Sequence, residues 1–265
     1  MLREGAQDDD AGHFVELTDW NFASPPFFLE YTDGGSNLLQ WAQVHLADTS
    51  RDMRIALFVQ IAEAVAAAHR IGVLHKDLKP ANVLVAREGE AWRVRLTDFG
   101  SGRLLDPDQL RQLGITRAGM TVTQDLADPS SGTPLYIAPE LFDGQLPTTR
   151  SDIYALGIML YQLLAGSLSR PMASGWEQDV DDAVLCEDIR SATEGDPRRR
   201  LSSAEELAER LRRLETRRQD ALQARAEAEL ARIEHDALKR ARTRRPYLIA
   251  LLLVLLAGIG VTAWL

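Results

Sequence analysis

The stretch HKDLKPAN at residues 75–82 places an acid, Asp77, a cation, Lys79, and an amide, Asn82, close together in the chain. The triplet DFG follows at residues 98–100, and GTPLYIAPE follows at residues 132–140. Without the third segment, HKDLKPAN followed by DFG has the composition of a polar turn and a hairpin. Their significance therefore lies in the occurrence of all three segments in this order.

Length and composition are those of an ordinary globular protein. The chain has 265 residues, of which 45% are hydrophobic and 26% charged, enough for one large domain or two small ones. Its net charge of −9 argues against a nucleic-acid-binding protein, so no nucleic-acid partner is expected. The one cysteine, Cys186, cannot form an internal disulfide, which suits a reducing compartment.

The last residues have the pattern of a membrane span. Residues 247–265, YLIALLLVLLAGIGVTAWL, carry no charge, and as a helix they could cross roughly 30 Å of hydrocarbon. A buried core helix is the alternative, but this stretch has no polar face. The preceding KRARTRRP, residues 239–246, puts basic residues at one end only, which predicts that the rest of the chain is cytoplasmic. We therefore expect a single-pass protein of the inner (cytoplasmic) membrane, with the lipid bilayer as a partner.

Three regions are expected: a globular domain at residues 1–213, a charged juxtamembrane helix at 214–245 and a transmembrane helix at 246–265. In the charged helix, the apolar stripe that ends at Leu214 is followed by residues without large apolar side chains: Arg218, Ala221 and Arg225. A solvated helix is therefore favoured. A homodimer through this helix stays open as the alternative.

Apolar periodicity predicts the main elements of the globular domain. Thr49 or Ser50 is the expected cap of the first long helix and Ser151 that of the second, while Ser203 with Glu206 has the pattern of a capping box. The predicted elements are strands at 13–20 and 27–31, a helix at 51–70, a hairpin formed by 83–85 and 94–97, and a buried helix at 151–166.

Together, the segments HKDLKPAN, TDFG and GTPLYIAPE resemble the eukaryotic-type (Hanks-type) serine/threonine protein kinases, including their bacterial members. The resemblance covers about residues 10–213. It implies an α+β, protein kinase-like fold with a mainly helical C-lobe and an incomplete N-lobe sheet. It also implies ATP-dependent phosphorylation of serine and threonine hydroxyls of protein substrates, with Mg²⁺, in membrane-linked signal transduction.

The resemblance assigns roles to the residues of the three segments. Asp77 matches the catalytic aspartate that accepts the proton of the substrate hydroxyl, and Lys79 would place a cation beside the transferred phosphate. Asn82 and Asp98 would bind Mg²⁺, which prefers such oxygen ligands. Thr133 matches the threonine that steadies the catalytic aspartate.

Nucleotide-binding residues follow from the same resemblance. LEYTDGG, residues 29–35, resembles the family's hinge, where backbone groups of Glu30 and Thr32 would bond the adenine ring. Leu84 would lie under that ring. Lys76 stands where many members have an arginine that pairs with a phosphorylated activation segment. A lysine loses the bidentate fork of that pairing, which puts control by such phosphorylation in question.

Other matching residues are expected to hold the site together. Asp152, in the buried helix, would hold the backbone of the catalytic loop. Glu140 and Arg200 would form a buried ion pair, since an isolated buried charge is costly. His75 and Phe99 would stack in the core and keep the two loops in register. The other histidines, His69 among them, are interpreted as core or surface residues.

Part of the family pattern is missing. No GxGxxG precedes Phe14, and no lysine precedes Lys76. We therefore expect an N-terminally truncated kinase with impaired nucleotide positioning. The alternative is a catalytically inactive pseudokinase that acts as a membrane-anchored regulatory or interaction module. A small-molecule phosphotransferase of the aminoglycoside type could use a similar loop, but it would not need APE or the buried-helix aspartate.

Overall fold

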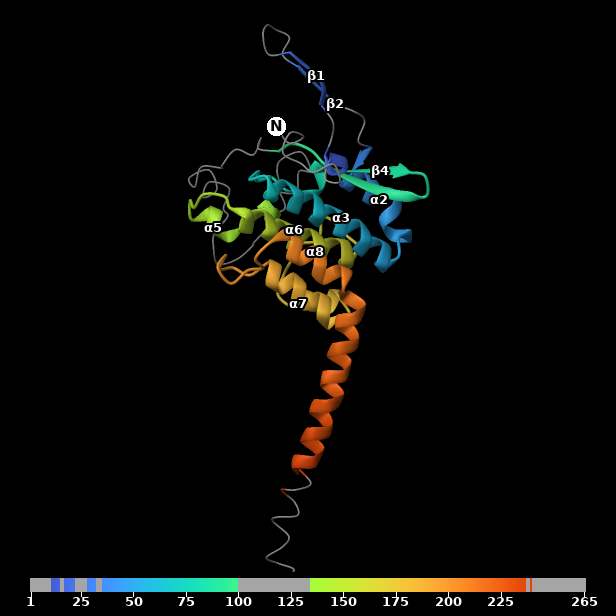
Figure 1. The fold of residues 1–265 in the computed structure, drawn as a ribbon, viewed down its shortest axis with the longest axis vertical. Coiled ribbons are helices and arrows are strands. Elements are labelled where there is room, and N and C mark those ends of the chain that lie inside the picture. Colours follow the sequence, from blue (N-terminus) through green and yellow to red (C-terminus); the bar gives the residue numbers. More distant parts are fainter. Residues whose placement is uncertain are drawn as a thin grey trace, which may run out of the picture. The chain divides into compact units, whose positions relative to one another are not determined.

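The computed structural model describes residues 11–14, 17–21, 28–31, 35–99, 134–236 and 239. The chain divides into two compact units, Met1–Leu214 and Glu215–Leu265. Residues 214–236 are helical. The other elements (Figure 1) are η1 (Ala11–His13), β1 (Leu17–Asn21), β2 (Phe28–Tyr31), β3 (Ser36–Asn37), α2 (Leu38–His45), η2 (Leu46–Asp48), α3 (Arg51–Arg70), η3 (Pro80–Asn82), β4 (Val83–Glu88), β5 (Ala91–Leu96), η5 (Pro134–Tyr136), α5 (Pro139–Phe142), α6 (Thr149–Ala165), η6 (Trp176–Asp179), α7 (Ala183–Ala192) and α8 (Ala204–Arg212).

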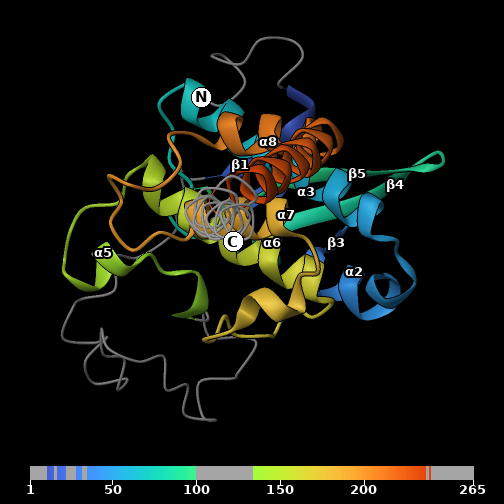
Figure 2. The same ribbon diagram turned by 90° about the horizontal axis from the view of Figure 1, so that it is seen from below.

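Helix α3 is the centre of the helical part of the first unit. Its first turn is capped by Ser50, whose side chain accepts a hydrogen bond from the backbone N–H of Met53, and the predicted bounds 51–70 are confirmed. Its buried face packs against α6, α8 and β5. Figure 1 shows these helices below the β4–β5 hairpin, and the turned view in Figure 2 shows α2 beside the sheet.

Helix α6 is buried along most of its length, as predicted. The prediction that Ser151 caps it is wrong, because the cap is Thr148, whose side chain accepts from the N–H of Arg150. Ser151 is the third helical residue, and its side chain accepts from the backbone N–H of Thr148. The helix ends at Gly166, whose φ of 77° is the left-handed conformation that glycine adopts without steric cost.

Two antiparallel sheets are described. In the three-stranded sheet β3-β4-β5, strands β4 and β5 pair from Val83 opposite Leu96 to Glu88 opposite Ala91, which confirms the predicted hairpin. Their alternate residues, such as Val85, face the core. Strands β1 and β2 form a separate two-stranded sheet, which confirms the two strands predicted near the N-terminus. The first strand begins at Leu17, however, and His13, predicted to be part of it, lies in η1.

Helix α8 begins differently from the predicted capping box. Ser203 accepts a hydrogen bond from the backbone N–H of Glu206, as expected for its cap. The Glu206 carboxylate, however, accepts from the N–H and hydroxyl of Ser202 and not from the N–H of Ser203. The reciprocal half of the predicted box is therefore displaced by one residue.

No helix within the described residues is long and apolar enough to span a membrane. The transmembrane helix predicted at residues 246–265 lies outside the part of the chain that the structure describes.

Helices α6 and α7 approach closely at Gly157. A Cβ atom at this position would lie 2.6 Å from Cγ2 of Thr193 and 2.8 Å from Cβ of Ala192. We predict that Gly157→Ala lowers the free energy of unfolding by about 1–2 kcal/mol, because overpacking outweighs the gain in helix propensity. Gly195→Ala, where the added Cβ has no atom within 4 Å, is the matched control. Equal thermal midpoints for the two variants would contradict the close approach.

Candidate active site

A buried carboxylate on α6 holds the loop at residues 75–82. Asp152 Oδ2 accepts a hydrogen bond from the backbone N–H of His75 at 2.9 Å, and Oδ1 accepts from that of Lys76 at 3.0 Å. Nε2 of His69, in the last turn of α3, lies 2.9 Å from the same Oδ2. Asp152 is 2% exposed. The role expected of Asp152 is therefore confirmed, and through it the core helix determines the path of the loop.

The loop brings three polar side chains together. Lys79 Nζ lies 2.9 Å from Oδ2 of Asp77. The side-chain amide of Asn82 donates to the backbone carbonyl of Asp77 at 2.8 Å and to its Oδ2 at 3.2 Å. A cation and an amide thus converge on the Asp77 carboxylate, which is partly exposed.

Asp98 follows β5 after a single intervening residue, Thr97. The backbone N–H of the preceding Thr97 donates to the carbonyl of Asn82 at 3.1 Å, so the two loops are joined one residue before Asp98. Lys76 and Asp98 are the non-glycine residues with positive φ in the described part of the chain, at 69° and 60°. Lys76 directly precedes Asp77, and Asp98 follows the residue that bonds to Asn82. Left-handed backbone at these two positions indicates a local conformation that the surrounding packing imposes.

An aromatic stack keeps the two loops in register. The ring centroids of His75 and Phe99 are 4.7 Å apart, and Phe14 meets Phe99 edge-on at 5.4 Å. This confirms the predicted packing of His75 on Phe99. Burial lowers the pKa of His75 and outweighs the nearby carboxylates of Asp152 and Asp77, so the ring is neutral at physiological pH.

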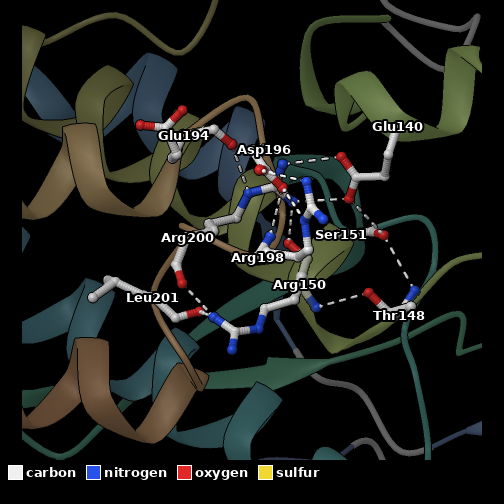
Figure 3. A network of polar contacts seen from close by, with 9 residues as sticks. All are labelled: Glu140, Thr148, Arg150, Ser151, Glu194, Asp196, Arg198, Arg200 and Leu201. Atoms are coloured by element: carbon white, nitrogen blue, oxygen red, sulfur yellow. Dashed lines mark hydrogen bonds and ion pairs between the residues drawn. The ribbon is translucent and has the colours of Figure 1, made fainter.

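A buried ion pair joins Glu140, the last residue of APE, to Arg200 (Figure 3). The guanidinium of Arg200 donates to both carboxylate oxygens of Glu140 at 2.9 Å, and both residues are buried, which confirms the predicted pair. Ser151 donates to Glu140 as well, and Arg200 also donates to the carbonyls of Glu194 and Arg150. In return, the Arg150 side chain donates to the carbonyls of Arg200 and Leu201.

This network also determines the charge state of the carboxyl group. Burial alone would raise the pKa of Glu140, but the hydrogen bonds from Arg200 and Ser151 outweigh burial and lower it. The Arg200 guanidinium lies over the ring of Tyr154, 5.1 Å from its centroid. Glu140 and Arg200 are therefore both ionised, and hydrogen bonds with neighbouring groups hold the pair in one geometry.

With this geometry in place, the chain can be compared with known proteins. Residues 15–245 match the family model described as protein kinase domain. The chain belongs to the protein kinase family. By family it is a serine/threonine protein kinase, a phosphate-transferring enzyme, and its fold is protein kinase-like, with a mostly helical C-lobe and a small sheet.

Bacterial relatives have the same family assignment. The chain is 39% identical over 142 residues to the serine/threonine-protein kinase PkaA of Streptomyces coelicolor, covering 53% of this chain and 23% of the relative. It is 38% identical over 163 residues to Pkn1 of Myxococcus xanthus, covering 59% and 21%. The chain thus spans about a fifth of the length of these curated relatives.

The fold also resembles a solved kinase domain. A crystal structure of a double mutant of the Mycobacterium tuberculosis PknI kinase domain superposes with a TM-score of 0.53 at 25% identity. The superposition covers 76% of this chain and 71% of that one.

The structure brings some of the predicted site residues together and leaves others outside its description. Asp77, Lys79 and Asn82 meet directly. Leu84 lies on β4, opposite Asn37 and Arg95. Glu30 lies in β2, in the separate sheet, where it pairs with Asp19. Thr32 and Thr133 lie outside the described residues.

The residues present fit the Mg²⁺ and ATP that this family uses in general. Within the described residues, no group of three His, Cys, Asp or Glu side chains could form a metal site. Mg²⁺ in kinase sites is held by one or two protein oxygens together with substrate phosphates. The Asn82 amide and the Asp98 carboxylate supply that kind of incomplete donor set.

Sequence reasoning missed the contribution of His69. It was interpreted as one of several scattered histidines, yet its ring contacts the carboxylate that holds the catalytic loop. The available signal was its place in the last turn of a predicted helix, shortly before HKDLKPAN. That spacing alone does not show that the end of α3 packs against α6.

We predict that Arg200→Ala lowers the free energy of unfolding by about 3 kcal/mol, because it leaves the Glu140 carboxylate buried without its cation. Arg198→Ala is the control, since the Arg198 side chain is 88% exposed and its ion pair with Asp196 is at the surface. Urea unfolding of both variants at pH 7 measures the difference.

The same pair should make stability depend on pH. Because the folded-state pKa of Glu140 is lowered, the stabilisation is present above the ordinary carboxyl pKa and is lost as pH falls through the lowered value. The difference in free energy of unfolding between wild type and Arg200→Ala should therefore become smaller in acid. A gap that widens in acid would contradict the assigned charge state.

Proposed function

We propose that the chain catalyses ATP-dependent phosphorylation of serine and threonine hydroxyls in protein substrates. The observation that carries the proposal is the convergence of Lys79 and Asn82 on the Asp77 carboxylate, on a loop held by Asp152. Phosphoryl transfer depends mainly on positioning and on cations placed around the transferred group. This arrangement supplies the acid, the cation and the amide that such a transfer uses at the reacting hydroxyl and phosphate.

Each residue has a stated role in the proposal. The Asp77 carboxylate orients the substrate hydroxyl and accepts its proton, and Lys79 holds positive charge beside the transferred phosphate. Asn82 and Asp98 would hold Mg²⁺, which when bound neutralises charge on the phosphates. Thr133 is proposed to steady Asp77, as in the family it resembles.

The adenine end of ATP is proposed to lie at the hinge. Backbone groups of Glu30 and Thr32 would bond the ring, and Leu84 on β4 would lie beneath it. The 265 residues contain no lysine before Lys76 and no GxGxxG before Phe14, so we propose that this polypeptide by itself holds the nucleotide weakly. The second candidate, favoured by that same observation, is an inactive pseudokinase that serves as a membrane-anchored interaction module.

We propose further that the kinase region lies in the cytoplasm and is anchored to the inner membrane by a single span at residues 246–265, for membrane-linked signalling. The uncharged stretch 247–265 and the basic residues 239–245 support this placement. A homodimer through the charged helix is not part of this proposal, because acidic side chains flank the apolar residues of that helix.

We predict that the chain fused to the N-lobe of an active family member phosphorylates a generic protein substrate, and that Asp77→Asn lowers the rate by at least about a hundredfold. Asp181→Asn, an exposed acid, is the control and should leave the rate unchanged. Radiolabelled phosphate transfer and nucleotide binding are measured together. The unfused chain should transfer phosphate far more slowly. Full activity without the fusion would refute the weak nucleotide site, and a fusion that binds ATP yet stays inactive would favour the pseudokinase.

We predict that protease added outside spheroplasts leaves the kinase region intact, because the basic residues 239–245 keep the preceding chain on the cytoplasmic side. The same protease added after lysis is the control and should digest it. Digestion of the kinase region in unbroken spheroplasts would show that the proposed orientation is wrong.

A further inference from the structure

The charged helix carries an exposed apolar stripe that has no role in the proposed phosphoryl transfer. Leu222, Leu230 and Ile233 are 64%, 63% and 56% exposed, although they are large apolar side chains. With Ala226 they recur every three or four residues, so they share one face of the helix. We call these four residues the 222–233 stripe. Single exposed leucines are common, but a row of them on one face indicates a docking surface.

The charges beside the stripe follow a seven-residue repeat. With Leu230 at position a and Ile233 at position d, the flanking e and g positions between 215 and 236 are acids except for Leu222. Three of the four arginines in this range lie one step further from the stripe, at position c, and Arg217 lies at position b. The acids at e and g are Glu215, Asp220, Glu227, Glu229, Glu234 and Asp236, and the bases at c are Arg218, Arg225 and Arg232.

This pattern opposes pairing with a second copy. In a parallel pair of helices, g of one copy faces e of the next repeat in the other, which sets Glu229 beside Glu234. In an antiparallel pair, g faces g and e faces e, so acids meet again. The remaining a and d positions, Thr216, Gln219 and Gln223, supply little apolar surface to offset this repulsion.

We propose that the 222–233 stripe docks a partner segment that is an amphipathic helix whose apolar stripe is flanked by lysine or arginine. Such a helix would cover Leu230 and Ile233 and would set cations against Glu227, Glu229 and Glu234. Opposite charges at e and g determine partner choice in paired helices, and they steer encounter as well. This interaction is independent of phosphoryl transfer, so it holds for an active kinase and for a pseudokinase alike.

The test uses the full chain in nanodiscs of neutral lipid and two designed helical peptides. Both peptides have leucine at a and d; one has lysine and the other glutamate at e and g. Fluorescence anisotropy should show the lysine peptide binding at least about tenfold more tightly than the glutamate peptide. Leu230→Asp should weaken the lysine peptide by about tenfold, whereas Ala228→Asp, which adds the same charge on the opposite face, should not.

This comparison separates docking from simple charge attraction. Attraction alone predicts that both added aspartates strengthen binding of the lysine peptide, and that result would overturn the proposal. The double variant Glu227→Lys with Glu234→Lys should weaken binding of the lysine peptide and narrow its advantage over the glutamate peptide, because only four of the six flanking acids remain. Equal binding of the two peptides to the unaltered chain would overturn the proposal. So would sedimentation showing a dimer at neutral pH that Leu230→Asp dissociates.

Discussion

The catalytic loop depends on one buried carboxylate. Asp152 lies in the core helix α6, almost without solvent contact, and a charge in such a place is stable only when it is well hydrogen-bonded. Its partners are the backbone N–H groups of His75 and Lys76 and the ring of His69. The requirement to satisfy this carboxylate therefore also determines the backbone on which Asp77 sits, and it ties the end of α3 to the same point.

Several features of the fold could be predicted from the sequence because local chemistry determines them. Helix α3 has the predicted bounds because Ser50 is a strong cap and the apolar spacing continues to Arg70. The β4–β5 hairpin follows from alternation around a turn. The meeting of Asp77, Lys79 and Asn82 was predictable because they lie within one short loop. The pairing of Glu140 with Arg200, 60 residues apart, was predicted from the resemblance to the kinase family and not from local chemistry.

The wrong predictions concern helix caps and contacts for which the local sequence allows more than one partner. Thr148 and Ser151 can each cap a helix, and only the packed position of α6 decides between them. A capping box would bond the Glu206 carboxylate to the N–H of Ser203, but the carboxylate bonds to Ser202. The contact between His69 and Asp152 depends on how α3 packs against α6. On the charged helix, the apolar stripe shifts after Leu214, so continuing the earlier stripe to Arg218 and Arg225 misses Leu222 and Leu230.

The positive φ angles at Lys76 and Asp98 have a consequence for how the protein can change. A left-handed backbone costs a residue with a side chain about 1–2 kcal/mol that glycine would not incur. Glycine at either position would thus relieve a local cost, but it would also remove the side chains and the stiffness that aim the two loops at each other. At Lys76 and Asp98, selection for stability would therefore favour glycine, whereas selection for an aligned site would favour the present residues.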